Sequence, residues 1–169
     1  MISLATGLLV RDGRVLLVAS RYPNHSKPLW NLPGGRQIPG ELLTETVERE
    51  FLEETGLRVR ADQLAYASES YDGEMHFLNA TFVVSPFDAA QGDTEFLSFD
   101  TGAARPAQDD TSGDHVVAVE WVPLAEVERR VAVRVVREPL LAYLRGELER
   151  RYAGSHEAGV TIEWPPDSH

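Results

Sequence analysis

Two apolar runs rich in β-branched residues open the chain, at Leu4–Val10 and Val15–Ser20. They are separated by a short polar stretch that contains Asp12-Gly13. An Asp-Gly pair supplies the positive φ angles that a two-residue turn requires, so the pattern predicts a β-hairpin. The next apolar residues lead into Pro33-Gly34-Gly35, and these two glycines predict a loop whose backbone can approach a ligand closely.

Apolar spacing changes from two residues to four after this loop. Leu43, Val47 and Phe51 recur every four residues, which places them on one stripe of an amphipathic helix. Gly56 follows at a position suited to a C-terminal cap, because glycine adopts the left-handed conformation easily. The pattern therefore predicts a helix from Glu41 to Thr55.

The second half of the chain predicts further strands and helices. The expected strands cover Leu57–Ser70, Met75–Ser85 and Val116–Val122, and the expected helices cover Leu124–Arg130 and Glu138–Tyr152, with Pro139 in a first turn. Residues 86–113 are rich in Gly, Ala, Asp and Thr, and so long a connection predicts either a functional or a mobile loop. We expect one domain over residues 1–153, followed by a C-terminal tail at 154–169 that lies loosely on the surface.

Composition narrows the possible partners. The 169 residues include 27 acidic and 16 basic side chains, for a net charge of −11, and no cysteine. The negative balance argues against broad binding to nucleic acid or anionic membranes, which both require a positive surface. The N-terminus has no basic leader, and no apolar stretch reaches the roughly 18 to 20 residues of a membrane span. We expect a cytoplasmic monomer or homodimer without nucleic-acid or membrane partners.

Acidic residues concentrate on the predicted helix. At about 100° per residue, the glutamates divide into two groups. Glu41, Glu45 and Glu48 should face water, whereas Glu50, Glu53 and Glu54 fall on or beside the apolar stripe. Carboxylates at such spacings are neighbours, and they repel one another unless a cation lies among them. Magnesium is usually held by a few carboxylates together with substrate phosphates. The alternative interpretation is an ordinary solvated helix face, since surface helices are rich in glutamate.

The stretch from Gly35 to Leu57 carries a longer pattern. It resembles the Nudix box, G-x5-E-x7-R-E-U-x-E-E-x-G-U, where U is a bulky aliphatic residue. The matching positions are Gly35, Glu41, Arg49, Glu50, Phe51, Glu53, Glu54, Gly56 and Leu57, and Phe51 at an aliphatic position is the one departure. The resemblance extends to residues 30–35 and 120–127, and the order of elements follows the family from about residue 3 to 150.

This resemblance to MutT-like Nudix hydrolases implies an α/β/α sandwich with a mixed β-sheet. It also implies Mg²⁺- or Mn²⁺-dependent hydrolysis of a nucleoside diphosphate linked to another moiety. The Gly35 carbonyl, Glu50, Glu53 and Glu54 would bind the metal, and Arg49 would orient the helix carboxylates. Glu41 would support the loop.

Other roles remain open. The general base is either Glu50 or Glu53 in the helix, or an acid outside it: Glu95, Asp110 or Asp114. Asp114 is also a candidate for an additional metal ligand. Candidates for contact with the small-molecule nucleotide are Arg21, Trp30 and His115, although an ordinary loop or sheet position explains each of them as well. His76 is expected to be a packed sheet residue.

Two functions from different classes fit the resemblance. The first is a catalytic pyrophosphohydrolase acting on a nucleoside triphosphate, a nucleotide-sugar or a dinucleoside polyphosphate. The second is a noncatalytic nucleotide-sensing protein on the same fold. Because sensors of this kind typically lose box glutamates and this chain retains them, the sequence favours the enzyme.

Overall fold

The computed structural model describes residues 1–87, 115–156 and 161–165. Its larger sheet has the strand order β5-β1-β7-β6-β9. These strands are β1 (Ile2–Leu8), β5 (Gly34–Arg36), β6 (Val59–Asp72), β7 (Met75–Pro86) and β9 (Tyr152–Gly154). The sheet is mixed, because β1 runs parallel to β7 and β6 parallel to β9, whereas the other pairs are antiparallel.

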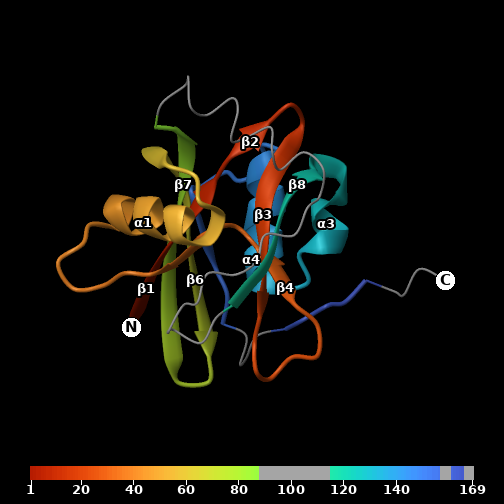
Figure 1. Cartoon of the computed structure of the whole chain (residues 1–169). Coiled ribbons are helices and arrows are strands. Elements are labelled where there is room, and N and C mark those ends of the chain that lie inside the picture. The colour runs from red at the N-terminus through yellow and green to blue at the C-terminus, as the bar shows by residue number, and fades with distance from the viewer. Residues whose placement is uncertain (88–114, 157–160, 166–169) are drawn as a thin grey trace.

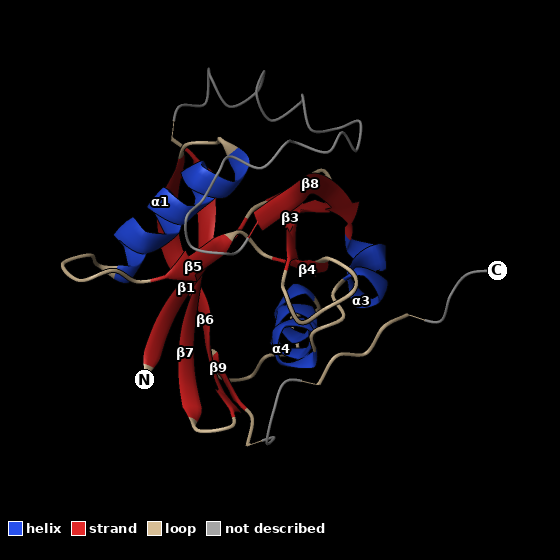
Figure 2. Cartoon of the chain, turned by 60° about the horizontal axis from the view of Figure 1, so that its bottom comes forward, coloured by secondary structure: helices blue, strands red, loops and turns tan. Residues whose placement is uncertain are grey.

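A smaller antiparallel sheet is built around β3. Its strands are β2 (Val10–Arg11), β3 (Arg14–Arg21), β4 (Leu29–Asn31) and β8 (His115–Pro123). The helices are α1 (Leu43–Thr55), the 3₁₀ turn η1 (Leu124–Glu126), α3 (Val127–Arg130) and α4 (Arg134–Leu144). Helix α1 covers one side of the sheets, and α3 and α4 lie on the other (Figures 1 and 2). The predicted α/β/α sandwich with a mixed sheet is confirmed.

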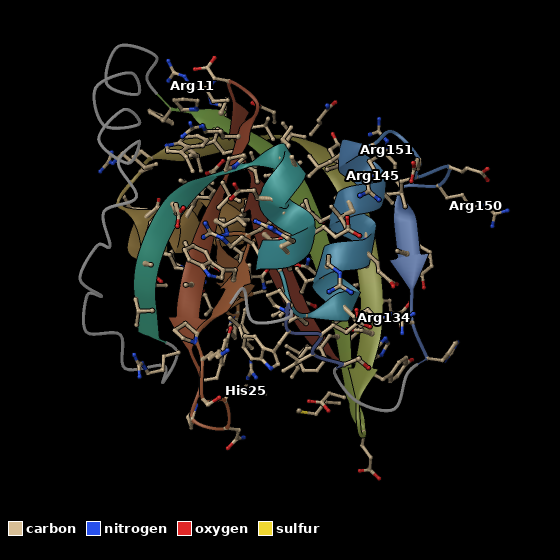
Figure 3. The ribbon with its side chains drawn as sticks, turned by 90° about the vertical axis from the view of Figure 1, so that its right-hand side faces the viewer. Arg11, His25, Arg134, Arg145, Arg150 and Arg151 are labelled. Carbon is tan, nitrogen blue, oxygen red and sulfur yellow. The ribbon has the colours of Figure 1, made fainter. Side chains whose placement is uncertain are left out.

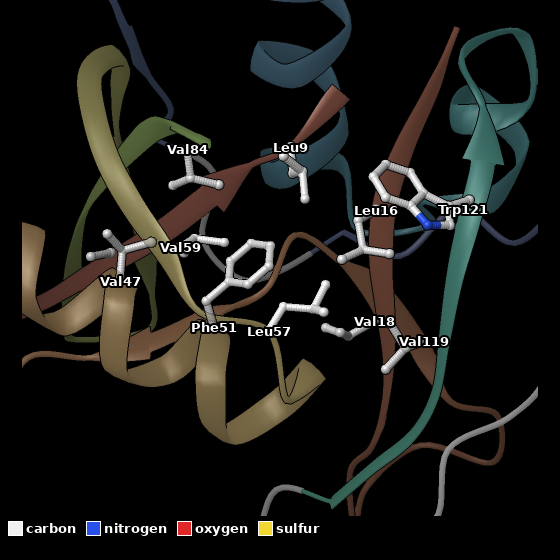
Figure 4. Close-up of a cluster of buried hydrophobic side chains, with 11 residues drawn as sticks. Leu9, Leu16, Val18, Val47, Phe51, Leu57, Val59, Val84, Val119 and Trp121 are labelled. Atoms are coloured by element: carbon white, nitrogen blue, oxygen red, sulfur yellow. The ribbon is translucent and has the colours of Figure 1, made fainter. Parts of the chain in front are cut away.

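Alternation along β3 divides the buried residues into two cores. Leu16 and Val18 point toward α1, where they join Phe51 and Trp121 (Figure 4). Their neighbours Val15 and Leu17 point the other way and pack with residues of α3 and α4. Since successive side chains of a strand face opposite sides, one nearly continuous apolar strand serves both layers.

Helix α1 forms where the apolar period predicts it. It begins two residues later than expected, and the carboxylate of Glu45 accepts the N–H of Leu42 at 2.7 Å. Its end is confirmed at Gly56, which has φ 75° and donates its N–H to the Leu52 carbonyl. The helix can approach β1 because Gly7 has no side chain: a Cβ there would lie 2.7 Å from the ring of Phe51.

The predicted N-terminal hairpin is wrong in its first strand. Asp12 and Gly13 do form the turn, with φ 50° and 72°, but they join only the two-residue strand β2 to β3. Most of the first apolar run is β1, which pairs with β5 and β7 in the other sheet. The chain changes sheets at Leu9, whose side chain is buried in the core that also contains Phe51 of α1. The predicted strands around residues 71–74 and over 116–122, and the short helix over 124–130, are confirmed.

The last helix and the tail also differ from expectation. Helix α4 spans Arg134–Leu144 rather than 138–152, because Gly146, with φ 69°, and Glu147 donate their N–H groups back to the final turn. The described tail residues are hydrogen-bonded to the domain, since Ser155 and Glu163 donate their N–H groups to the carbonyls of Glu69 and Ala132. Strand β9 pairs with β6, and the Thr161 carbonyl accepts the N–H of Arg134.

Arginines line the side of the molecule that carries α4 and β9 (Figure 3). Two of them are paired with carboxylates, Arg134 with Glu138 at 2.7 Å and Arg145 with Glu128 at 3.1 Å. The positive charge on this side is therefore partly neutralised locally.

Among the helices in the described residues, none is both long enough and apolar enough to span a membrane.

We expect the Gly7→Ala substitution to lower the free energy of unfolding by roughly 1–3 kcal/mol, because the added methyl group overpacks the buried ring of Phe51. Chemical denaturation of the single variants and of Gly7→Ala/Phe51→Leu measures this. The two substitutions should be less costly together than the sum of their separate costs, since the smaller side chain relieves the clash. A Gly7→Ala variant as stable as the unaltered protein would contradict the packing described.

Candidate functional site

Strand β5 brings its glycines directly against helix α1. A Cβ at Gly35 would lie 2.5 Å from the carboxyl group of Glu50, so only glycine lets this carboxylate lie against the strand without being displaced. One turn further along the helix, a carboxylate oxygen of Glu54 accepts the N–H of Gly34 at 3.2 Å. The two glutamates thus lie along the same edge strand, as their spacing on one helix face allows.

Arg49 connects the carboxylates of this segment. Its Nε donates to Glu41 at 2.6 Å, and its Nη1 donates to Glu50 at 2.9 Å and to Glu53 at 3.2 Å. The remaining Nη2 donates to the carbonyl of Arg36 in β5, at 3.1 Å. Arg49 therefore forms ion pairs with Glu50 and Glu53, and the same guanidinium also ties the helix to the strand.

The helical projection placed two glutamates wrongly. Glu48 was expected to face water, but it is half-buried and its carboxylate accepts the N–H of Ala61 in β6 at 2.9 Å. Glu41 is the second. It was expected to face water, but its side chain is 15% exposed and is held by Arg49, by the Thr46 hydroxyl at 2.9 Å and by the N–H of Ile38. The hydrogen bond from Arg49 is the main reason why the pKa of Glu41 falls to about 2. Glu41 precedes the first helical residue, so an angle of 100° per residue does not apply to it. The loop-supporting role implied for it agrees with these contacts.

The carboxylate oxygens are of the chemical type that binds a divalent cation. Hard oxygen donors are what Mg²⁺ prefers, and Glu50, Glu53 and Glu54 offer them within two turns beside the backbone of β5. Within the described ranges, no three acidic or histidine side chains are already gathered around a common point. Instead, hydrogen-bond donors compensate the negative charges, Arg49 for Glu50 and Glu53 and the Gly34 N–H for Glu54.

The candidate substrate contacts lie elsewhere. Trp30 in β4 packs against the core on the α4 side, and the guanidinium of Arg130 lies 4.9 Å from its ring centroid. Arg21 ends β3 and is paired in register with His115 at the start of β8. The described contacts bring neither Trp30 nor Arg21 to the box carboxylates, and the side chain of His115 lies outside the described part of the structure.

The remaining candidates are placed as follows. His76 is a sheet residue of β7, as expected, and it contacts Glu69 at 2.5 Å and stacks on Tyr71 at 4.5 Å. The downstream acids Glu95, Asp110 and Asp114 lie outside the described residues, as does all but the start of the long segment 86–113.

Comparison with known proteins agrees with the fold and the box. The NUDIX domain family matches residues 1–144, so the chain belongs to this family. The expected family is thereby confirmed, and relatives in it are named as hydrolases.

Two of these relatives differ in the substrates that their names give. An ADP-ribose pyrophosphatase from Methanocaldococcus jannaschii is 35% identical over 80 residues, which cover 46% of this chain and 47% of the relative. An NAD-capped RNA hydrolase NudC from Chromobacterium violaceum is 29% identical over 136 residues, which cover 80% of this chain and 45% of the relative. The chain thus matches slightly less than half the length of each.

Solved structures share the fold. A NUDIX hydrolase from Nitrosomonas europaea superimposes with a TM-score of 0.63 at 21% identity, over 86% of this chain and 90% of the other. A MutT protein from Bacillus halodurans gives a TM-score of 0.59 at 18% identity, over 94% and 91% of the two chains.

We expect the Arg49→Met substitution to return the pKa of the Glu41 carboxyl from about 2 toward its usual value of 4.5. The change follows because the main donor that favours the ionised carboxylate is lost. A ¹³C NMR titration of the glutamate carboxyl carbons measures it.

Stability should follow the same linkage. Because folding lowers this pKa, the interaction stabilises the native state fully above about pH 4.5 and is lost as the pH falls toward 2. The stability difference between the unaltered protein and Arg49→Met should therefore shrink over that interval. A Glu41 pKa that is the same in both proteins would contradict the assigned contact.

Proposed function

We propose that the protein is a divalent-metal-dependent pyrophosphohydrolase that cleaves the pyrophosphate linkage of a nucleoside diphosphate joined to another moiety. The observation that carries the proposal is the placement of Glu50 and Glu54 against the glycines of β5. Membership of the NUDIX family supports it, as do relatives named as a pyrophosphatase and as a hydrolase.

The chemistry requires negatively charged ligands that hold a divalent cation beside the phosphates. Attack on a pyrophosphate requires neutralisation of charge on the phosphate oxygens and an in-line water. Mg²⁺ or Mn²⁺ supplies that neutralisation and lowers the pKa of a bound water when it is held by the Gly35 carbonyl, Glu50, Glu53 and Glu54. The side chains missing at Gly34 and Gly35 let strand β1 and the Glu50 carboxylate lie directly against the backbone of β5.

The other residues of the network have supporting roles in this proposal. Arg49 holds Glu50 and Glu53 in fixed positions and links them to β5, which makes it a positioning residue. Glu53 is the most exposed of these carboxylates, at 49%, and is therefore the more accessible of the two helix candidates for general base. The substrate would be a nucleoside triphosphate, a nucleotide-sugar or a dinucleoside polyphosphate.

The purified protein should cleave at least one of these three substrate classes with Mg²⁺ or Mn²⁺, and chelation by EDTA should abolish the reaction. Glu54→Gln should lower kcat by roughly 10²–10³, because an amide cannot supply the negative charge that holds the cation. Assays that separate inorganic phosphate from pyrophosphate and nucleoside monophosphate identify both the substrate and the bond that is broken.

Glu45→Gln is the matched control on the same helix. Among the described residues its carboxylate accepts the N–H of Leu42, and an amide oxygen can still do so, so activity should stay near that of the unaltered protein. Folding of each variant is checked by circular dichroism and thermal denaturation. Nucleotide binding without turnover of any tested compound would contradict catalysis and favour a sensor.

A further inference from the structure

Thr46 carries a buried hydroxyl near the start of α1, at a position that the box pattern leaves open. Its side chain is fully buried. The hydroxyl lies 2.9 Å from Oε2 of Glu41 and 3.1 Å from the carbonyl oxygen of Leu42. A hydroxyl has a single proton, so it donates fully to only one of these oxygens at a time.

The carboxylate is the acceptor that needs this proton. The Leu42 carbonyl already accepts the backbone N–H of Thr46 at 2.9 Å, as the helix requires. A hydrogen bond to an ionised carboxylate is also stronger than one to a neutral carbonyl. Packing does not require the hydroxyl either, because valine is branched in the same way and has nearly the same shape. The Thr46 hydroxyl therefore acts on Glu41 rather than on its own helix.

Glu41 is held through both of its carboxylate oxygens. Oε1 accepts Arg49 Nε at 2.6 Å, and Oε2 accepts Arg49 Nη2 at 3.2 Å. A two-point pair with a guanidinium requires one orientation of the carboxylate plane. Two donors outside that pair also reach Oε2, the Thr46 hydroxyl at 2.9 Å and the exposed N–H of Ile38 at 3.3 Å. Of these two, the hydroxyl is the closer and lies on a fully buried side chain, so it fixes the plane more firmly.

The orientation of Glu41 determines where Arg49 directs its remaining donor. With Nε and Nη2 engaged by Glu41, the planar guanidinium directs Nη1 at Glu50 and Glu53. A rotated Glu41 carboxylate would turn the guanidinium plane and move Nη1 away from these partners. The placement of two candidate metal ligands thus depends, through Glu41 and Arg49, on a single hydroxyl.

We infer that Thr46 is a positioning residue of the candidate metal site, whose hydroxyl orients Glu41 and thereby the guanidinium that holds Glu50 and Glu53. The role adds to the box, because the pattern leaves this position open. It rests on the proposed function, since that proposal assigns the two glutamates as metal ligands. The competing explanation is a hydroxyl that merely bonds its own helix backbone, as mid-helix threonines often do.

Thr46→Val removes the hydroxyl and keeps the bulk of the side chain. In the metal-free protein, ¹³C NMR should show the pKa of the Glu41 carboxyl rising from about 2 toward 4.5. The rise should be smaller than in Arg49→Met, because the hydrogen bond from Arg49 is the larger cause of the lowered pKa. Mn²⁺ affinity, measured by electron paramagnetic resonance, should fall about three- to tenfold, since the residue acts on the ligands through two others.

Thr46→Ser retains the hydroxyl, so it should restore both the pKa and the Mn²⁺ affinity to values near those of the unaltered protein. Thr55→Val is the matched control on the same helix. Thr55 is also fully buried, but its hydroxyl donates to the Phe51 carbonyl at 2.6 Å and accepts the Leu57 N–H at 3.1 Å. The control should lower the melting temperature and leave both readouts unchanged. If Thr46→Val does not fold, Thr46→Ala replaces it, because it also lacks the hydroxyl.

The outcomes separate this role from the proposed hydrolysis. Unchanged Mn²⁺ affinity in the hydroxyl-free variant, with or without a change in the Glu41 pKa, would overturn the role even if nucleotides are hydrolysed. Failure of Thr46→Ser to restore both readouts would also overturn it, because the lost methyl group would then be the cause. So would the absence of Mn²⁺ binding by the unaltered protein. Recovery in Thr46→Ser, in a protein that binds Mn²⁺ but cleaves no nucleotide, would support the role and contradict the proposed function.

Discussion

Helix α1 meets the larger sheet at two positions where no side chain intervenes. Gly7 admits the ring of Phe51, which anchors the helix in the core, and Gly35 admits the carboxyl group of Glu50. Together these two contacts hold both the apolar face of the helix and its acidic edge against the larger sheet. The position of every box carboxylate therefore depends on this close approach, and the core and the candidate site share one packing interface.

The carboxylates along the acidic edge of α1 need a compensating positive charge, because carboxylates held one turn apart repel one another. Arg49 supplies it by engaging Glu41, Glu50 and Glu53, and these contacts raise the already high pKa of the guanidinium, with Glu41 as the largest cause. A planar group with five donors can hold several carboxylates at once, which a lysine ammonium does less well. The network keeps the ligand set in place and leaves Glu53 accessible.

Local patterns predicted what local interactions determine. The period of Leu43, Val47 and Phe51 and the cap at Gly56 depend on neighbouring residues, and α1 formed where they placed it. Strand β5 was expected to be a loop, because glycine is unfavourable in strands. It is a strand because β1 pairs with it. The division of the first apolar run between two sheets is likewise set by distant partners.

The sequence identified some residues of the candidate site but did not predict the contacts of others. The box spacing identified the glutamates and Arg49, since that pattern is linear along the chain. The burial of Glu41 depends on a loop that folds back onto Arg49, and the contact between Glu48 and the Ala61 N–H depends on the path of β6 beside the helix. Neither feature has a signature in the linear spacing.

Mn²⁺ binding to the unaltered protein and to Gly35→Ala, measured by electron paramagnetic resonance, tests the central claim most directly. The three atoms nearest to the new Cβ all belong to the carboxyl end of the Glu50 side chain, so the fold should survive while the carboxylate is displaced. We predict a melting temperature within a few degrees of the unaltered protein and Mn²⁺ affinity lowered by about tenfold or more. Equal affinity in both proteins would contradict the account.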